Sequence, residues 1–182
     1  MSRMPSIFLS HGAPTFAVEP GRLGPLLLAL GARLPRPKAV VVISPHWMTR
    51  EVAVSAAERP ETIHDFGGFP AALYDLRYMA SGAPMLASQI VAALRDAEIP
   101  ATLDARRGLD HGAWVPLMHL YPQANVPVVQ VSMPVATMHD GGGARAWALG
   151  QALAPLADEG VLIVGSGSLT HNLRDFQNAF HD

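Results

Sequence analysis

Four short apolar runs, rich in β-branched residues, set the strongest limit on how this chain can fold. Within each run the apolar residues follow one another instead of alternating with polar ones, a pattern typical of strands covered on both faces of a sheet. Such strands are predicted at Ser6–Ser10, Ala39–Ser44, Val126–Ser132 and Val161–Gly165, and weaker strands begin at Glu51 and Ile99.

Helical patterns separate these runs. The first helical pattern follows Gly24. The second spans Pro84 to Ile99, with its apolar residues on one face. The third spans Ala144 to Gly160, where Pro155 predicts a kink. Strands that alternate with helices predict an α/β fold, here a single domain over residues 1–182 with a mainly parallel or mixed central sheet flanked by helices. The long connection from Arg59 to Gly82 is expected to be functional, because compact domains rarely keep long idle loops.

Composition removes several classes of function. The net charge of -2, with no basic cluster, argues against binding to nucleic acid or to an anionic membrane surface. The chain has no cysteine, so disulfides, thiolate zinc sites, iron–sulfur clusters and cysteine nucleophiles are excluded. Because no secretory signal and no long apolar span is recognisable, we expect a soluble, cytoplasmic protein.

Histidines recur where predicted strands end. His11, His46 and His171 each follow an apolar run, and His64 and His111 lie in predicted loops that could reach the same place. In an open α/β sheet, ligands collect in the crevice at the carboxyl ends of the strands. Imidazole binds metals and exchanges protons near neutral pH, so these residues predict a metal site or a centre of acid–base chemistry. The nitrogen and oxygen ligands available suit zinc or non-haem iron(II).

Five motifs stand in a fixed order along the chain: SHGAP at 10–14, SPHW at 44–47, HDFGGFP at 64–70, LDHGAWVPL at 109–117 and GSGSLTHNL at 165–173. Together they resemble the class III extradiol ring-cleavage dioxygenases of the LigB-like superfamily, specifically the DOPA-dioxygenase type. The resemblance covers the whole chain. It implies a non-haem metal, normally Fe(II), and an activity that opens a catechol ring beside its paired hydroxyls with molecular oxygen.

The resemblance also implies roles for individual residues. His11 and His46 match the metal ligands, His171 the acid–base residue, and His111 a second active-site histidine that contacts substrate or oxygen. The HDFGGFP segment matches the substrate-side loop, with His64, Phe66 and Pro70 as wall residues. Trp47 and Trp114 flank motif histidines, where they either stack on the substrate ring or fill the core. Asp65 and Asp110 are each adjacent to a motif histidine and are candidates to orient the rings.

The sequence departs from this pattern at its carboxyl end. Members of the family are longer, and their third metal ligand lies after the region where this chain stops, as do their closing strand and helix elements. Three interpretations stay open: a truncated enzyme, a complete one that takes its third ligand from another residue, and a shortened relative without activity. The candidates for that other ligand are His64, His111, His139, Asp140 and His181. Missing closing elements would expose apolar surface, which a homo-oligomer is one way to cover.

Two other classes of function compete with the dioxygenase. A zinc-dependent hydrolase would use Zn(II)-bound water as its nucleophile. A binding protein would keep the fold and lose the chemistry. Only the dioxygenase consumes oxygen with a catechol, so oxygen uptake separates the three. The sequence does not indicate which catechol is the substrate.

Overall fold

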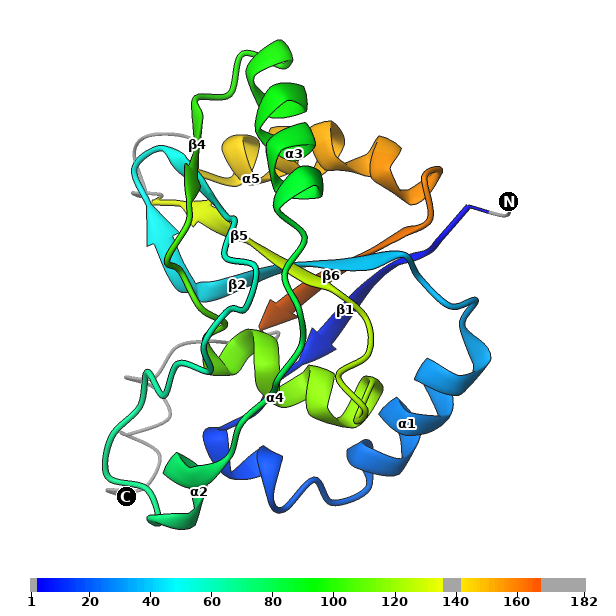
Figure 1. Ribbon diagram of the computed structural model, residues 1–182, viewed down its shortest axis with the longest axis vertical. Helices are drawn as coiled ribbons and strands as arrows, with labels where there is room; N and C mark the ends of the chain where they lie inside the picture. The colour runs from blue at the N-terminus through cyan, green and yellow to red at the C-terminus, as the bar shows by residue number, and fades with distance from the viewer. Residues whose placement is uncertain (1–2, 136–141, 168–182) are drawn as a thin grey trace.

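A mixed β-sheet lies at the centre of the protein (Figure 1). The computed structural model describes residues 3–135 and 142–167, and in this part of the chain the sheet has six strands in the order β1-β6-β2-β5-β3-β4. They are β1 (Ser6–Ser10), β2 (Ala39–Thr49), β3 (Val52–Ser55), β4 (Ala101–Asp104), β5 (Val128–Pro134) and β6 (Val161–Gly167).

Most neighbouring strands run parallel. The pairs β1–β6, β6–β2, β2–β5 and β3–β4 are parallel, and β3 meets β5 in antiparallel orientation through Val54 and Val131. The predicted α/β fold with a mixed central sheet is therefore confirmed.

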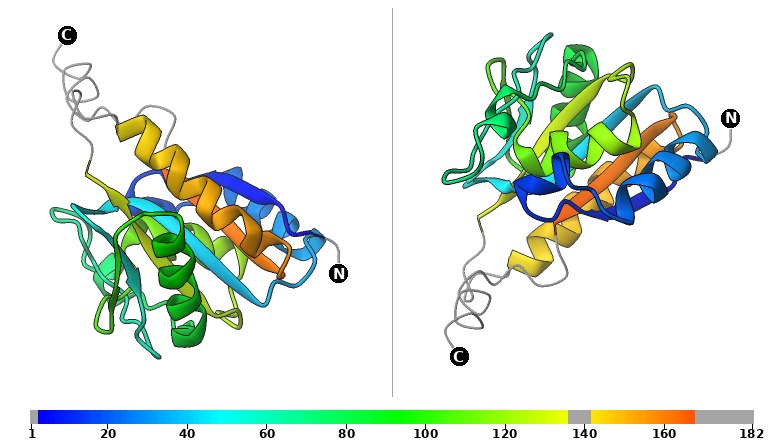
Figure 2. Two further views of the ribbon diagram at one scale, coloured as in Figure 1. Left: turned by 90° about the horizontal axis from the view of Figure 1, so that it is seen from above. Right: turned by 90° about the horizontal axis from the view of Figure 1, so that it is seen from below.

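Helices cover both faces of the sheet (Figure 2). Helices α1 (Leu23–Arg33) and α4 (His111–Leu120) lie on one face, and α3 (Pro84–Asp96) and α5 (Gly142–Leu153) lie on the other. The short helix α2 (Ala72–Asp75) and the 3-10 turns Pro14–Ala17 and Ala154–Ala157 complete the described elements. None of the helices in the described residues is both long and apolar enough to cross a membrane.

Successive valines of β2 show why its sequence does not alternate. Val40 and Val42 pack into the apolar cluster under α1 and α4, whereas Val41 packs into the cluster under α3 and α5. All three are fully buried. A strand buried on both faces has no position that favours a polar residue, which is the pattern seen in the sequence.

The structure shifts several predicted boundaries by a few residues, and two of them further. Strand β2 continues past Ser44 to Thr49. The helix predicted to run to Gly160 ends at Leu153, and Pro155 lies in the first turn of the 3-10 turn that follows. Proline has no N–H to donate and its ring crowds the carbonyl four residues earlier, so the predicted kink is in fact a helix end.

Candidate metal centre

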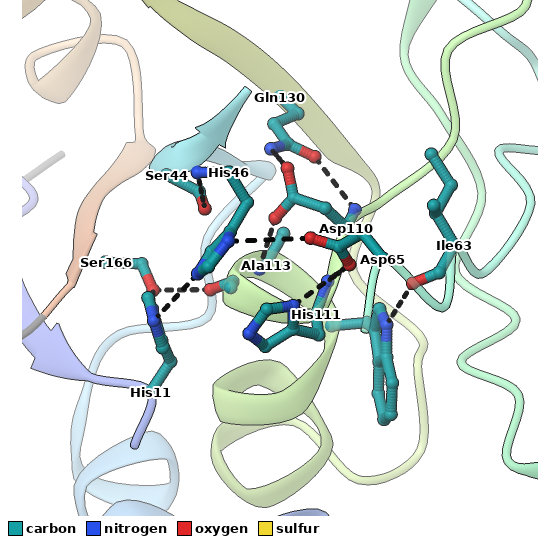
Figure 3. A network of polar contacts seen from close by, with 12 residues as sticks. His11, Ser44, His46, Ile63, Asp65, Asp110, His111, Ala113, Gln130 and Ser166 are labelled. Atoms are coloured by element: carbon teal, nitrogen blue, oxygen red, sulfur yellow. Dashed lines mark hydrogen bonds and ion pairs between the residues drawn. The ribbon is translucent and has the colours of Figure 1, made fainter. Parts of the chain in front are cut away.

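Three histidines from separate elements meet at one end of the sheet (Figure 3). His11 follows β1, His46 lies within β2 and His111 is the first residue of α4. One ring nitrogen of each lies within 4.8 Å of the others, and among the described residues these three form a group able to hold a metal ion. His11 and His111 are buried and the side chain of His46 is 21% exposed, so the site opens at His46.

His11 is held by the end of the β1–β6 ladder. Its backbone N–H donates to Gly167 O at 3.1 Å, which extends the parallel pairing one residue past β1. Its ring nitrogen Nδ1 lies 2.9 Å from Ser166 Oγ on β6, and its Nε2 lies 3.1 Å from Nε2 of His46. The last residues of β6 therefore fix both the backbone and the ring of His11.

A bulge in β2 carries His46. Ser44 pairs with Ser132 and Met48 with Met133, so three residues of β2, 45–47, are inserted between adjacent positions of β5. The backbone N–H of His46 donates to Ser44 Oγ at 3.2 Å inside this bulge. Bulges bend a strand and redirect its side chains, which is how His46 turns toward His11 although the strand continues beyond it.

His111 owes its position to a buried helix cap, and its prediction as a loop residue is wrong. Asp110 is fully buried and caps α4 by accepting from the backbone N–H of Ala113 at 3.2 Å. Its carboxylate also accepts from Arg107 Nη2 at 2.9 Å and from Gln130 Nε2. A carboxylate at a helix N-terminus satisfies otherwise unpaired N–H groups, so it fixes where α4 begins.

Gly112 lets α4 approach β2 closely. A Cβ at this position would overlap Ser44 Oγ and lie 2.9 Å from His46 Cδ2, closer than a carbon can come without a shift. The glycine after His111 is thus required by the contact between the helix and the bulge. This contact brings the His46 and His111 ring centroids to 3.9 Å.

Asp65 places one carboxylate beside two of the rings. Its Oδ1 lies 2.9 Å from His111 Nδ1 and accepts from the backbone N–H of His111 at 2.8 Å, and its Oδ2 lies 3.6 Å from His46 Nδ1. The contact with His111 Nδ1 has the distance of an ion pair without the alignment of a hydrogen bond. Burial raises the pKa of the Asp65 carboxyl, but hydrogen bonding and the charge of His111 together outweigh burial and lower that pKa.

The HDFGGFP segment forms an aromatic wall. Phe66 meets His111 edge-on at a centroid distance of 5.6 Å. His64 does not join the three histidines, because its Nε2 lies 3.1 Å from Leu76 O and its ring packs against Phe66, Tyr74 and Trp114. Pro70 is exposed.

Trp47 lies beneath Arg107 instead of presenting an open face. It is buried, with the guanidinium carbon of Arg107 4.8 Å from its ring centroid. Since Arg107 also binds Asp110, it links the β2 bulge to the start of α4. Trp114 is fully buried, and its indole N–H donates to Ile63 O at 2.9 Å.

Some predicted residues cannot be placed. His171 lies outside the described residues, as do His139, Asp140 and His181. Conversely, sequence reasoning missed Ser166, Gln130 and Arg107. Ser166 had a signal in the GSG motif at the end of β6, whereas nothing local marks Gln130, which reads as an ordinary buried position in a strand.

An α/β sheet that gathers three imidazoles beside an ionised carboxylate has the donor set of a nitrogen-and-oxygen metal site. Residues 27–182 match the family described as the catalytic LigB subunit of aromatic ring-opening dioxygenase, and the chain belongs to this family. The family predicted from the five motifs is thereby confirmed.

Similar proteins include two curated ones named 4,5-DOPA dioxygenase extradiol. The protein from Escherichia coli (strain K12) is 48% identical over 176 residues, and that from Beta vulgaris is 46% identical over 170 residues; the alignments cover 95% and 91% of this chain. A crystal structure of an uncharacterized Escherichia coli K12 protein has a TM-score of 0.74 and 39% identity, covering 94% of this chain and 63% of that one. The chain spans 62% of the length of both curated relatives.

Proposed function

We propose that this chain carries the metal-binding part of an extradiol dioxygenase, which opens the ring of a catechol with molecular oxygen. The convergence of His11, His46 and His111 in a member of an aromatic ring-opening family is the observation that carries this proposal. Because two relatives are named for 4,5-DOPA, DOPA is the first catechol to test.

The residues present fit a metal ion. The Nε2 atoms of His11 and His46 lie 3.1 Å apart. Two nitrogens bound to one ion at about 2.1 Å are separated by about 3.0 Å at a right angle and about 3.4 Å at a tetrahedral angle. The described donors are nitrogen and oxygen only, which suits Fe(II) or Zn(II). We assign metal binding to His11 and His46, and a third ligand after the last of the five motifs stays a prediction from the resemblance.

Bound at these imidazoles, Fe(II) would supply a coordination position for oxygen and would stabilise a catechol oxyanion. Zinc ordinarily binds nitrogen sites more tightly than Fe(II), so zinc in a purified sample would not identify the working metal.

The chain's own residues hold the rings and the substrate. The Asp65 carboxylate faces Nδ1 of both His46 and His111. The Nε2 atom of each ring therefore points away from the carboxylate. We assign His111 to proton exchange with a catechol hydroxyl, since a nearby imidazole can take and return a proton near neutral pH. Phe66 borders His111 and would limit the access of water to the ring. The acid–base role of His171 stays a prediction from the resemblance.

The test joins metal content and activity in one sample. The chain is loaded with Fe(II) without oxygen, its iron is quantified, and DOPA and oxygen are then added while oxygen uptake and product absorbance are followed. We expect uptake with ring opening once the carboxyl-terminal segment of a longer relative is appended, because the third ligand is predicted there. His46→Ala should abolish this uptake and weaken metal binding by more than about 100-fold, because a direct ligand contributes more than the outer partners whose loss costs 10–100-fold.

His119→Ala is the matched control. Its Nε2 lies 2.9 Å from Phe16 O, and it is not one of the three clustered histidines. It should bind iron like the unchanged chain. Stoichiometric iron without oxygen uptake in the extended chain would contradict the dioxygenase and favour a binding protein. Turnover that needs zinc but no oxygen would favour a hydrolase.

A further inference from the structure

A second feature of the site concerns the hydrogen bonds that set His11 for metal binding. We propose that Pro116, Gly112 and Ser166 form a hydrogen-bond relay that fixes the tautomer of His11, so that Ser166 is a positioning residue of the metal centre. The role of the relay in metal binding rests on the proposed function, whereas its hydrogen bonds and the tautomer of His11 do not.

The relay begins with a missing donor in α4. In an α-helix the carbonyl of Gly112 accepts from the backbone N–H of residue 116. That residue is Pro116, which has no N–H. The carbonyl of Gly112 instead accepts a hydrogen bond from Ser166 Oγ on β6. A proline inside the helix thus leaves a buried carbonyl for a partner from another element.

The hydrogen bond from Ser166 to Gly112 determines how Ser166 can bond to His11. A serine hydroxyl has one hydrogen, and here it is donated to Gly112 O, which can only accept. Ser166 Oγ therefore acts as an acceptor toward His11 Nδ1, 2.9 Å away, and Nδ1 must carry a proton (Figure 3). His11 is 1% exposed and Ser166 5%, so water does not readily replace either bond.

The fixed tautomer has a consequence at the other ring nitrogen. A neutral imidazole protonated on Nδ1 carries its lone pair on Nε2. This is the atom that lies 3.1 Å from His46 Nε2, where the metal is proposed to bind. The relay therefore aims a lone pair of His11 at the metal position.

The relay also differs in charge from the support of the other two rings. His46 and His111 face the carboxylate of Asp65, whereas His11 faces a neutral hydroxyl backed by a neutral carbonyl. Histidine ligands commonly donate their second N–H to a carboxylate or to a backbone carbonyl. Here a serine lies between the Nδ1 atom of His11 and the carbonyl of Gly112, so the hydrogen-bond partner at Nδ1 is a neutral one.

Two measurements test the relay in the full chain. Long-range ¹H–¹⁵N spectra of histidine-labelled, metal-free protein report the tautomer of His11, and competition with a chromophoric chelator reports the affinity for Zn²⁺. The variants are Ser166→Ala, which removes the hydroxyl, and Pro116→Ala, which restores an N–H that competes for Gly112 O. Ser132→Ala is the control, because this buried serine on β5 bonds Ala53 N and Thr49 and lies outside the relay.

We expect His11 to be protonated on Nδ1 in the unchanged chain and to become a mixture of tautomers in Ser166→Ala. The affinity for Zn²⁺ should fall about tenfold in Ser166→Ala, the lower end of what loss of an outer partner costs. Pro116→Ala should fall between Ser166→Ala and the unchanged chain, and Ser132→Ala should match the unchanged chain. Because Pro116 enters the relay only through the carbonyl of Gly112, an effect of Pro116→Ala distinguishes a relay from simple packing by Ser166.

The relay is overturned if His11 is protonated on Nε2 in the unchanged chain, or if Ser166→Ala alters neither tautomer nor affinity. Equal losses in Ser166→Ala and Ser132→Ala would also overturn it, since they would reflect general disturbance of the sheet. If the unchanged chain takes up no Zn²⁺, the proposed metal function fails, and the spectra alone then decide: a tautomer that changes in Ser166→Ala supports the relay, and one that does not overturns it.

Discussion

Helices α3 and α4 pack on opposite faces of the same sheet, yet they are built on different principles. Helix α3 buries one stripe, made of Ala87, Ile90, Val91 and Leu94, and exposes the opposite side. Helix α4 is buried continuously from His111 to Leu117. An amphipathic helix needs only apolar partners on one side, whereas a helix buried all round must also satisfy its polar groups from neighbouring elements.

The difference shows which parts of the molecule tolerate change. The polar groups at the start of α4 bind side chains from three other segments: Asp110 binds Gln130, Gly112 binds Ser166, and the backbone of His111 binds Asp65. The corresponding end of α3 begins with Pro84, which has no N–H and so needs no acceptor partner. We infer that α3 mainly stabilises the fold and that α4 mainly positions the site.

Leu94→Ala in α3 should cause the largest change in the free energy of unfolding, and it tests whether the two helices have separate roles. Leu94 is fully buried, so its truncation should lower the free energy of unfolding by about 2–5 kcal/mol, the usual cost of a core leucine. Urea denaturation measures the loss. The affinity of the folded protein for Zn²⁺ should not change; a parallel loss of affinity would break the division of roles between the two helices.

A pair of identical substitutions sharpens the comparison. Gly112→Ala places a Cβ against Ser44 and His46 and should destabilise the fold by about 1–3 kcal/mol, as overpacking does, while also weakening Zn²⁺ binding. Gly150→Ala in α5, on the α3 side of the sheet, meets nothing within 4 Å and should stabilise by about 0.5–1 kcal/mol. Thermal or urea unfolding of both variants checks the opposite signs, and equal signs would argue against a special contact at Gly112.

The smallest expected change in stability comes from a substitution at the end of α3. Glu98 follows its C-terminal cap with a φ of 59°, in the left-handed region that disfavours residues with a Cβ. Glu98→Gly should therefore stabilise by about 0.5–1 kcal/mol, after the greater flexibility of glycine in the unfolded chain is deducted. Urea denaturation measures the gain. Destabilisation would mean that the Glu98 side chain contributes more to the end of α3 than its exposed position indicates.

The same contrast explains what could be predicted from the sequence. Helix α3 and the buried strands follow periodic rules, so their residues identify them without knowledge of the fold. Helix α4 escaped prediction because Gly112 and Pro116 read as helix-breaking residues, and their roles become visible only when β2 and β6 lie beside them. The bulge that carries His46 escaped for a similar reason, since it is defined by its partner strand β5.

The site was predictable in outline. The rule that ligands collect at the ends of parallel strands brought His11 and His46 together, and the structure confirms that they adjoin. It also brings in His111, from an element predicted as a loop. The position of His64 depends on the path of residues 59–82, where the chain has little regular structure and packing of aromatic rings decides the outcome.

The strand order has a consequence for how the site forms during synthesis. Strand β1 leads into His11 but pairs with β6. In this pairing Ser6 lies beside Ile163, so β6 is synthesised more than 150 residues after β1. Strand β5 likewise inserts between β2 and β3 after both have been made. Contacts between such distant segments are slow to form. The ribosome must therefore deliver β6 before His11 can be held in place, so the candidate metal centre assembles late among the described features of the chain.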